Sequence, residues 1–180
     1  HNRCRRQRQM CIRDRTTRFF YGPGAPVTSI SIDVADKQIA AASLDRTVTV
    51  WDLETGAEKA SLEHREFVTS VQFGPGQDSK LLASASANNI YLWNYETKEQ
   101  VQVWRAHQSE ITEVIFLGDG EFLLSAAHSG WIKIWDTKTF ELKHQVLAHG
   151  ATINHVAHHR NENGQMIVAT TAADARVRFW

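Results

Sequence analysis

A repeat of about 42 residues runs through most of the chain and restricts its fold more than any other feature. Tryptophan recurs at spacings of 42, 42 and 45 residues, at Trp51, Trp93, Trp135 and Trp180. Each tryptophan ends a stretch with a period of two, such as residues 48–51 and 132–135. That period and the β-branched residues in it are typical of a β-strand. We therefore expect a series of similar sheets.

Each repeat holds four candidate strands. A more continuously apolar stretch precedes each tryptophan strand, at residues 39–43, 81–86, 122–127 and 166–172. A first strand comes before it, at residues 27–32, 68–73, 111–116 and 153–158. A fourth follows the tryptophan, at residues 58–62, 100–104 and 142–147. Turn residues such as Gly118-Asp119-Gly120 separate the strands, and no helical period appears. The pattern predicts an all-β chain of four-stranded antiparallel meanders.

Two columns of residues characterise the repeat. Asp52 and Asp136 directly follow two of the tryptophans. Histidines stand 43 and 42 residues apart at His64, His107 and His149. In these columns and its four strands per unit, the stretch 26–180 resembles the WD-repeat (β-transducin-like) β-propeller family.

The resemblance implies a propeller of four-stranded antiparallel blades. About four blades are present, at residues 26–63, 64–106, 107–148 and 149–180, within a propeller region 19–180. Because rings of this family usually have seven blades, we interpret the chain as a fragment of a seven-bladed or larger ring. The fourth blade would then leave an unpaired edge strand, and such edges favour aggregation.

The family resemblance also implies a hydrogen-bonded tetrad within each blade. Its members are the loop histidine, a second-strand Ser or Thr, an Asp of the next turn and the strand Trp. Only the fourth repeat has all four, as His149, Thr170, Asp174 and Trp180. The first has Ser43, Asp45 and Trp51 but Pro23 in place of histidine, while Asn88 and Ser129 stand near the Asp position of the second and third. Because half-satisfied buried networks are costly, we expect weaker networks in the first three blades.

Residues 1–18 differ sharply from the rest. They hold seven arginines against Asp14 alone, and both cysteines, Cys4 and Cys11. Residues 19–180 carry 13 basic and 19 acidic groups, which argues against a nucleic-acid groove across the body. The segment is interpreted either as a basic arm for nuclear import or RNA phosphates, or as a solvated, disordered or non-native tail.

No catalytic or cofactor motif is present. The sequence lacks HExxH, GxSxG, a phosphate-binding glycine-lysine loop and GxGxxG, so we expect no enzyme activity, cofactor or small-molecule substrate. His155, His158 and His159 cluster, but positions 155 and 158 of a strand point to opposite faces, so no metal site is expected. His158 occupies the position of Phe73 and Phe116 and is expected in the core. No apolar run is long enough to span a membrane.

The family resemblance implies that function lies in the loops of one rim. Exposed aromatic residues and arginines are the usual anchors of protein interfaces. Candidate rim residues are Arg65, Phe67, Trp104, Arg105, His128 and Trp131. The main hypothesis is a non-catalytic scaffold for protein–protein interactions within a multiprotein complex in the cytoplasm or nucleus. The alternative is an RNA-associated nuclear assembly factor that uses the basic tail, in the manner of ribosome biogenesis factors.

Overall fold

The described part of the chain consists of β-strands and turns. The computed structural model describes residues 20, 22–76 and 79–180, and within these ranges fifteen strands and no helix are present. Residues 1–18, including Cys4 and Cys11, and the boundary expected at residue 19 lie outside the described residues.

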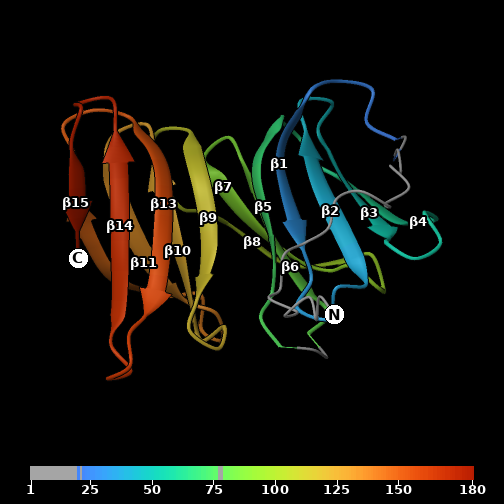
Figure 1. The fold of residues 1–180 in the computed structure, drawn as a ribbon. Coiled ribbons are helices and arrows are strands. Elements are labelled where there is room, and N and C mark those ends of the chain that lie inside the picture. Colours follow the sequence, from blue (N-terminus) through green and yellow to red (C-terminus); the bar gives the residue numbers. More distant parts are fainter. Residues whose placement is uncertain (1–19, 21, 77–78) are drawn as a thin grey trace, which may run out of the picture.

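The strands form four separate sheets in chain order. Each pairs neighbouring strands antiparallel, in the orders β1-β2-β3-β4, β5-β6-β7-β8, β9-β10-β11-β12 and β13-β14-β15. We call these sheets blades 1 to 4, and they follow one another in Figure 1. The strand bounds are β1 Val27–Ile32, β2 Gln38–Ser43, β3 Thr47–Asp52, β4 Glu58–Glu63, β5 Val68–Phe73, β6 Leu81–Ser86, β7 Asn89–Asn94, β8 Glu99–Arg105, β9 Ile111–Leu117, β10 Phe122–Ala127, β11 Trp131–Asp136, β12 Leu142–Leu147, β13 Ile153–Arg160, β14 Met166–Ala172 and β15 Val177–Phe179.

The first strands of the blades form the inner side of the arrangement. Strand β1 contacts β5, β5 contacts β9 and β9 contacts β13, and these strands stand in a row in Figure 1. In blades 1 and 2 the second and third strands are largely buried, whereas all six residues of β12 are exposed. This is the blade arrangement of a β-propeller, and it confirms the predicted fold class.

The core is divided into three clusters, one for each junction between consecutive blades. In the first junction, Phe73 and Tyr95 of blade 2 pack in one cluster with Val48 and Val50 of blade 1. The second and third junctions repeat this arrangement with blades 2 and 3 and with blades 3 and 4. Each fully buried side chain of this size stabilises the fold by about 1.5–3 kcal/mol. The blades are therefore held chiefly by their neighbours.

Polar side chains also join consecutive inner strands. Ser29 Oγ accepts the backbone N–H of Val71 at 3.3 Å, and one blade further on Ser70 Oγ accepts that of Val114 at 3.1 Å. At the third junction Glu113 Oε2 accepts the N–H of Val156 at 2.5 Å. An inner strand has an edge that no strand pairs, and such edges need another partner. Here that partner is the side chain at one repeated position of the preceding blade, which accepts a backbone N–H of the inner strand.

The expectation that His158 belongs to the core is wrong. Its side chain is exposed, whereas Phe73 and Phe116 at the same register position are buried in the junction clusters. The imidazole borders a hollow of about 320 Å³ that Gly118 and Met166 also line. A polar ring in place of phenylalanine does not fill the junction of blades 3 and 4 at this point, so solvent reaches it.

Gly130 provides a test of the blade geometry. It lies in the turn between β10 and β11 with φ +79°, and a Cβ there would overlap the carbonyl oxygen of His149. Gly130→Ala should therefore lower the free energy of unfolding by about 3 kcal/mol or more. Gly56→Ala is the matched control, because Gly56 has φ +74° with nothing within 4 Å of its Cβ position. Its cost should be about 1 kcal/mol. Equal losses in urea denaturation would contradict the close approach at Gly130.

Candidate interaction rim

One rim of the propeller collects the loops that were expected to carry function. The connections from the fourth strand of one blade to the first of the next lie on it, together with the turns between second and third strands, at the top of Figure 1. The turns between first and second strands lie at the opposite rim, as the β13–β14 hairpin shows. We call the first of these the upper rim.

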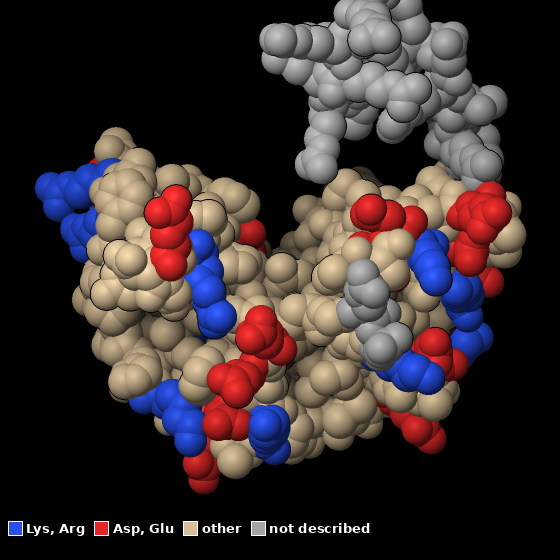
Figure 2. All heavy atoms as spheres, turned by 60° about the horizontal axis from the view of Figure 1, so that its bottom comes forward, with Lys and Arg blue, Asp and Glu red and all other residues tan. Residues whose placement is uncertain are grey.

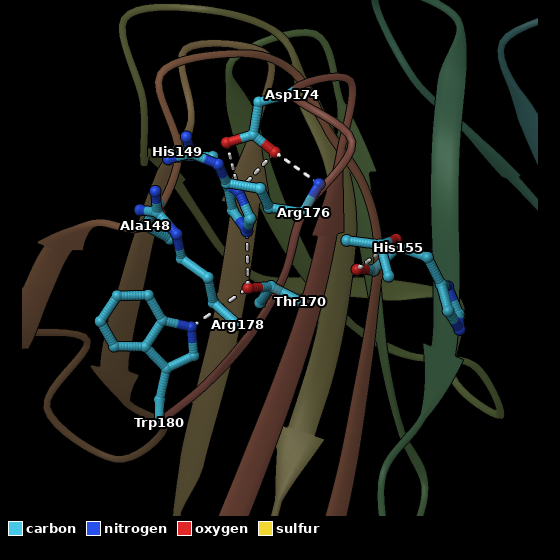
Figure 3. Close-up of polar contacts among 9 residues, drawn as sticks. Ala148, His149, His155, Thr170, Asp174, Arg176, Arg178 and Trp180 are labelled. Carbon is cyan, nitrogen blue, oxygen red and sulfur yellow. Dashed lines mark hydrogen bonds and ion pairs between the residues drawn. The ribbon is translucent and has the colours of Figure 1, made fainter.

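A continuous hydrogen-bond chain supports the upper rim in blade 4 (Figure 3). Trp180 Nε1 donates to Thr170 Oγ1 at 3.1 Å, and Thr170 Oγ1 lies 2.9 Å from His149 Nε2. His149 Nδ1 lies 2.9 Å from Asp174 Oδ2. A neutral imidazole with its proton on Nδ1 satisfies every member, since it donates to the carboxylate and accepts from the hydroxyl.

These hydrogen bonds connect the β14–β15 turn to the loop between β12 and β13. His149 is fully buried, and its hydrogen bond is the main reason that the pKa of Asp174 lies below its ordinary value. Asp174 Oδ1 also accepts the backbone N–H of Arg176 at 3.1 Å. The side chain of Arg178 donates to the carbonyl of Ala148 in the loop. In this blade, the four residues implied by the family resemblance are therefore joined directly.

Blades 2 and 3 contain shorter networks. His64 Nε2 lies 2.7 Å from Ser84 Oγ, which also accepts from Trp93 Nε1 at 3.2 Å. In place of an aspartate, the carbonyl of Leu62 accepts from His64 Nδ1 at 3.0 Å. The same three-residue network recurs in blade 3, where Ser125 Oγ lies 2.8 Å from His107 Nε2 and 2.9 Å from Trp135 Nε1.

The side chains near the expected aspartate positions of these blades make no hydrogen bond to the imidazole of their own blade in the described structure. Asn88 donates to the carbonyl of Gln108 at 3.1 Å, and Ser129 Oγ pairs with Ser109 Oγ at 2.9 Å. Both bridge a second-to-third turn to the neighbouring loop. Ser84 was not assigned to this network from the sequence. Its alignment with Ser125 and Thr170 along the repeat would have predicted it.

Blade 1 replaces the histidine network with backbone contacts. Asp45 accepts the backbone N–H of Gly24 at 2.6 Å, and Ser43 Oγ donates to the carbonyl of Ala25 at 3.1 Å. Trp51 is covered by Phe20, whose ring centroid lies 5.8 Å away, and by Gly22. Segment 22–25 therefore takes the place that the histidine loops occupy in the other blades.

The aspartates that follow the tryptophans lie at the rim opposite the upper rim and hold turns there. Asp52 Oδ1 accepts the backbone N–H groups of Glu54 and Thr55 at 3.0 and 2.8 Å. Asp136 holds the equivalent turn of blade 3 in the same way, at 2.9 Å for both N–H groups. These bonds, above all those from Thr55 and Thr139, hold the pKa of each carboxyl below its ordinary value. Both aspartates stabilise turns.

Four of the predicted rim residues are exposed. Phe67, in the loop between β4 and β5, is 41% exposed. Arg65 in the same loop, Arg105 at the end of β8 and His128 after β10 are also exposed. Trp131 is half-buried and lines a hollow of about 260 Å³ together with Lys133 and Gln145.

Trp104 is half-buried and does not belong to this exposed set, although it lines a hollow together with Arg65 and Arg105. Its half-buried ring packs against the junction of blades 2 and 3, with centroid distances of 6.0 Å to Trp135 and 5.5 Å to Phe140. Tryptophan on an outer strand can reach across to the next blade because its side chain is long. Its Nε1 is buried and has no hydrogen-bond partner among the described residues.

Metal ligands and membrane spans were also sought. Within residues 20, 22–76 and 79–180, no group of three or more His, Cys, Asp or Glu side chains could hold a metal ion. In the same part of the chain there is no helix with the length and hydropathy that a membrane span requires.

The buried histidines predict a pH dependence of stability. Burial lowers the pKa of His64 and of His107 to about 4, whereas an unfolded histidine titrates at about 6.5. The unfolded state therefore binds more protons over this window, so the free energy of unfolding should fall as the pH decreases from about 6.5 to about 4. Urea midpoints across this window measure the effect.

Glutamine substitutions identify the source of that slope. The combined variant His64→Gln and His107→Gln should flatten the decrease, because the titrating rings are gone. His144→Gln changes an exposed histidine of β12 and is the matched control. A slope that is unchanged in the double variant would show that other groups cause the pH dependence.

Comparison with known proteins agrees with this architecture. The family model described as "WD domain, G-beta repeat" matches residues 14–52, 56–94 and 98–136. The probable coatomer subunit beta' of Schizosaccharomyces pombe is 30% identical over 126 residues, which cover 68% of this chain and 16% of that protein. Target of rapamycin complex subunit LST8 of Saccharomyces cerevisiae is 27% identical over 131 residues, covering 72% and 42%.

Two further similarities extend the comparison. Pre-mRNA-processing factor 17 of Homo sapiens is 27% identical over 124 residues, which cover 68% of this chain and 21% of that protein. The chain thus spans less than half the length of each of these relatives. The crystal structure of the computationally designed Ika4 protein superimposes with a TM-score of 0.74 at 25% identity, covering 90% of this chain and 94% of the designed one.

The three family matches each end at the residue that follows a column tryptophan, namely Asp52, Asn94 and Asp136. They cover more than half of the chain and contain strands β1 to β11 of its first three blades. The chain therefore belongs to the WD-repeat family of β-propellers.

Proposed function

We propose that this protein is a non-catalytic scaffold that holds partner proteins of a multiprotein assembly on its upper rim. The observation that carries the proposal is the position of Phe67. Its aromatic ring is exposed although the residues around it, His64 and Val68, are buried and fixed in the blade. A large apolar side chain on a rigid loop binds with little loss of conformational entropy.

Two arginines lie on the same rim as Phe67. Arg65 lies two residues away in the same loop, and Arg105 ends the outer strand of the same blade. Together with Asn89 and Tyr91 they border a hollow of about 260 Å³. Arginine and aromatic residues are enriched in protein interfaces. This surface suits a partner segment with an apolar anchor and acidic neighbours.

The comparisons support a scaffold in general terms. WD-repeat propellers are generally non-catalytic, and relatives named as a coatomer subunit and as a subunit of the target of rapamycin complex are parts of assemblies by those names. The tetrad residues are engaged within the blade, which supports a structural use of His149 and Asp174. We assign the protein to the cytoplasm or nucleus, in protein complexes without a cofactor.

The rim variant Phe67→Ala with Trp131→Ala tests this function. It should reduce the capture of specific partners by about tenfold or more, because interface aromatics contribute most of the binding energy. Proteins retained by the immobilised chain are quantified by mass spectrometry. Val101→Ala with Leu147→Ala is the matched control, since both are exposed aliphatic residues on outer strands. Partners retained equally by the rim variant and the control, with both folded, would contradict the proposal.

A second candidate function is RNA binding through residues 1–18. Its basis is the seven arginines of that segment, while the acidic balance of residues 19–180 offers no comparable surface. Binding of a single-stranded RNA should then fall steeply as salt rises and disappear when residues 1–18 are deleted. Binding that survives the deletion would contradict this candidate.

A further inference from the structure

Blade 3 lacks one charged group that blade 4 contains. Counted back from the column tryptophans, Ser129 occupies the position of Asp174, whose carboxylate lies 2.9 Å from Nδ1 of His149 (Figure 3). The hydroxyl of Ser129 instead pairs with that of Ser109 at 2.9 Å. The hydrogen-bond network of blade 3 therefore ends without the carboxylate that completes the network of blade 4.

The histidine of blade 3 keeps the group that would bind such a carboxylate. His107 is only 3% exposed, and its Nε2 lies 2.8 Å from Ser125 Oγ, which accepts from Trp135 Nε1. In the tautomer that matches blade 4, the hydroxyl donates to Nε2 and the ring carries its own proton on Nδ1. The described residues form no hydrogen bond to this second nitrogen. A buried N–H donor is thus left for an acceptor from outside the blade.

A hollow of about 260 Å³ opens beside this donor. The residues that border it are His107, Gln108, Ser129, Trp131, Lys133 and Gln145. Both the histidine and the residue at the missing carboxylate position therefore face the same space. A carboxyl group is far smaller than this volume, so the hollow can take a whole acidic side chain.

Lys133 adds a positive charge at the edge of the hollow. Its Nζ donates to the carbonyl of Ala106 at 2.8 Å and lies 5.6 Å from the ring centroid of Trp135, which holds the ammonium group in place. Burial and, to a smaller extent, the charge of Lys133 lower the pKa of His107 to about 4. The ring is therefore neutral near physiological pH, and the hollow combines a neutral donor with one cation.

The same pair of groups already binds a carboxylate in blade 4. Arg178 occupies the position of Lys133 and likewise donates to a loop carbonyl. The hydrogen bond from His149 and the charge of Arg178 both lower the pKa of Asp174, so they stabilise its ionised form. Blade 3 repeats this arrangement without its anion.

Blade 2 offers no comparable site. Nδ1 of His64 already lies 3.0 Å from the carbonyl of Leu62. Tyr91 stands where blade 3 has Lys133, and its ring centroid lies 4.8 Å from that of His64. Among the described residues of blades 2 to 4, a free imidazole donor and a cation therefore meet beside a hollow only in blade 3.

We propose that this hollow binds the side-chain carboxylate of an aspartate or glutamate of a partner protein. The carboxylate accepts from Nδ1 of His107 and faces the ammonium group of Lys133, and hydrogen bonds of this charge-assisted kind are strong. Half-buried Trp131 lines the same hollow, so a residue presented by a protein segment also gains apolar contact that a small free anion lacks. This site rests on the proposed scaffold function and specifies the partner's chemistry at a second place on the propeller.

A displayed library of random dodecapeptides, selected on the immobilised full chain, measures the preference. Selected peptides should be enriched in aspartate and glutamate. Lys133→Gln should raise the dissociation constant of a selected acidic peptide about tenfold or more, because it removes the cation. The amide form of that peptide should bind the wild type equally weakly. Lys138→Gln is the matched control, since Lys138 is an exposed lysine in the turn that follows β11, and it should leave the affinity unchanged.

Ser129→Asp supplies the carboxylate from the chain itself. It should also weaken the acidic peptide about tenfold or more, because the donor is then already occupied. His128→Asp adds the same group at the neighbouring exposed residue and should have little effect. Circular dichroism establishes that each variant is folded.

Three results would overturn the proposal. These are selected peptides without an excess of acidic residues, acidic peptides that bind Lys133→Gln and Ser129→Asp as tightly as the wild type, and acetate alone binding as tightly as the peptide. The last result would assign the hollow to small anions. Peptides whose binding is lost in Phe67→Ala would still support the scaffold function in each case, so the failure of this site and the failure of that function can be told apart.

Discussion

The burial of apolar blade faces by neighbouring blades is the constraint on which the rest of the structure depends. A four-stranded sheet with two apolar faces is stable only when something covers both. Here three junction clusters do so, and inner-strand side chains such as Ser29 and Glu113 complete the edges. In the described structure the outward faces of blades 1 and 4 expose apolar side chains such as Ile30 and Phe179.

Polar networks at the upper rim fix loops on this apolar frame. In blades 2 to 4 a buried histidine joins the loop to a second-strand hydroxyl, which also accepts from the column tryptophan, so two strands and a loop are held together. Burial keeps His64 and His107 neutral near physiological pH. Only blade 4 adds a carboxylate, which anchors the β14–β15 turn as well. In these three blades the rim loops are therefore joined to the sheet by buried hydrogen bonds.

The hydrogen bonds inside the blades leave the exposed loop side chains available for binding. The histidines, the hydroxyls and Asp174, which resemble active-site residues, are all hydrogen-bonded within the blades. Phe67, Arg65 and Arg105 remain exposed next to buried residues of the blades. Opposite them, Asp52 and Asp136 only hold turns. Structural and recognition tasks are thus divided between residues of the same repeat. Rim residues can vary without loss of the blade, which is why the repeat by itself does not specify a partner.

The repeat of about 42 residues and the period of two were enough to predict the strands and their order, because these depend on residues close in sequence or on a fixed spacing. The tetrad of blade 4 was implied by the family resemblance. The repeat did not predict the contacts between blades. Trp104 was expected on the rim and packs on Trp135, His158 was expected in the core and is exposed, and Asn88 and Ser129 bridge loops. The sequence by itself determined the blades and their internal pairing. Only the tertiary structure decided which surfaces are covered, since that depends on how closely one blade approaches the next.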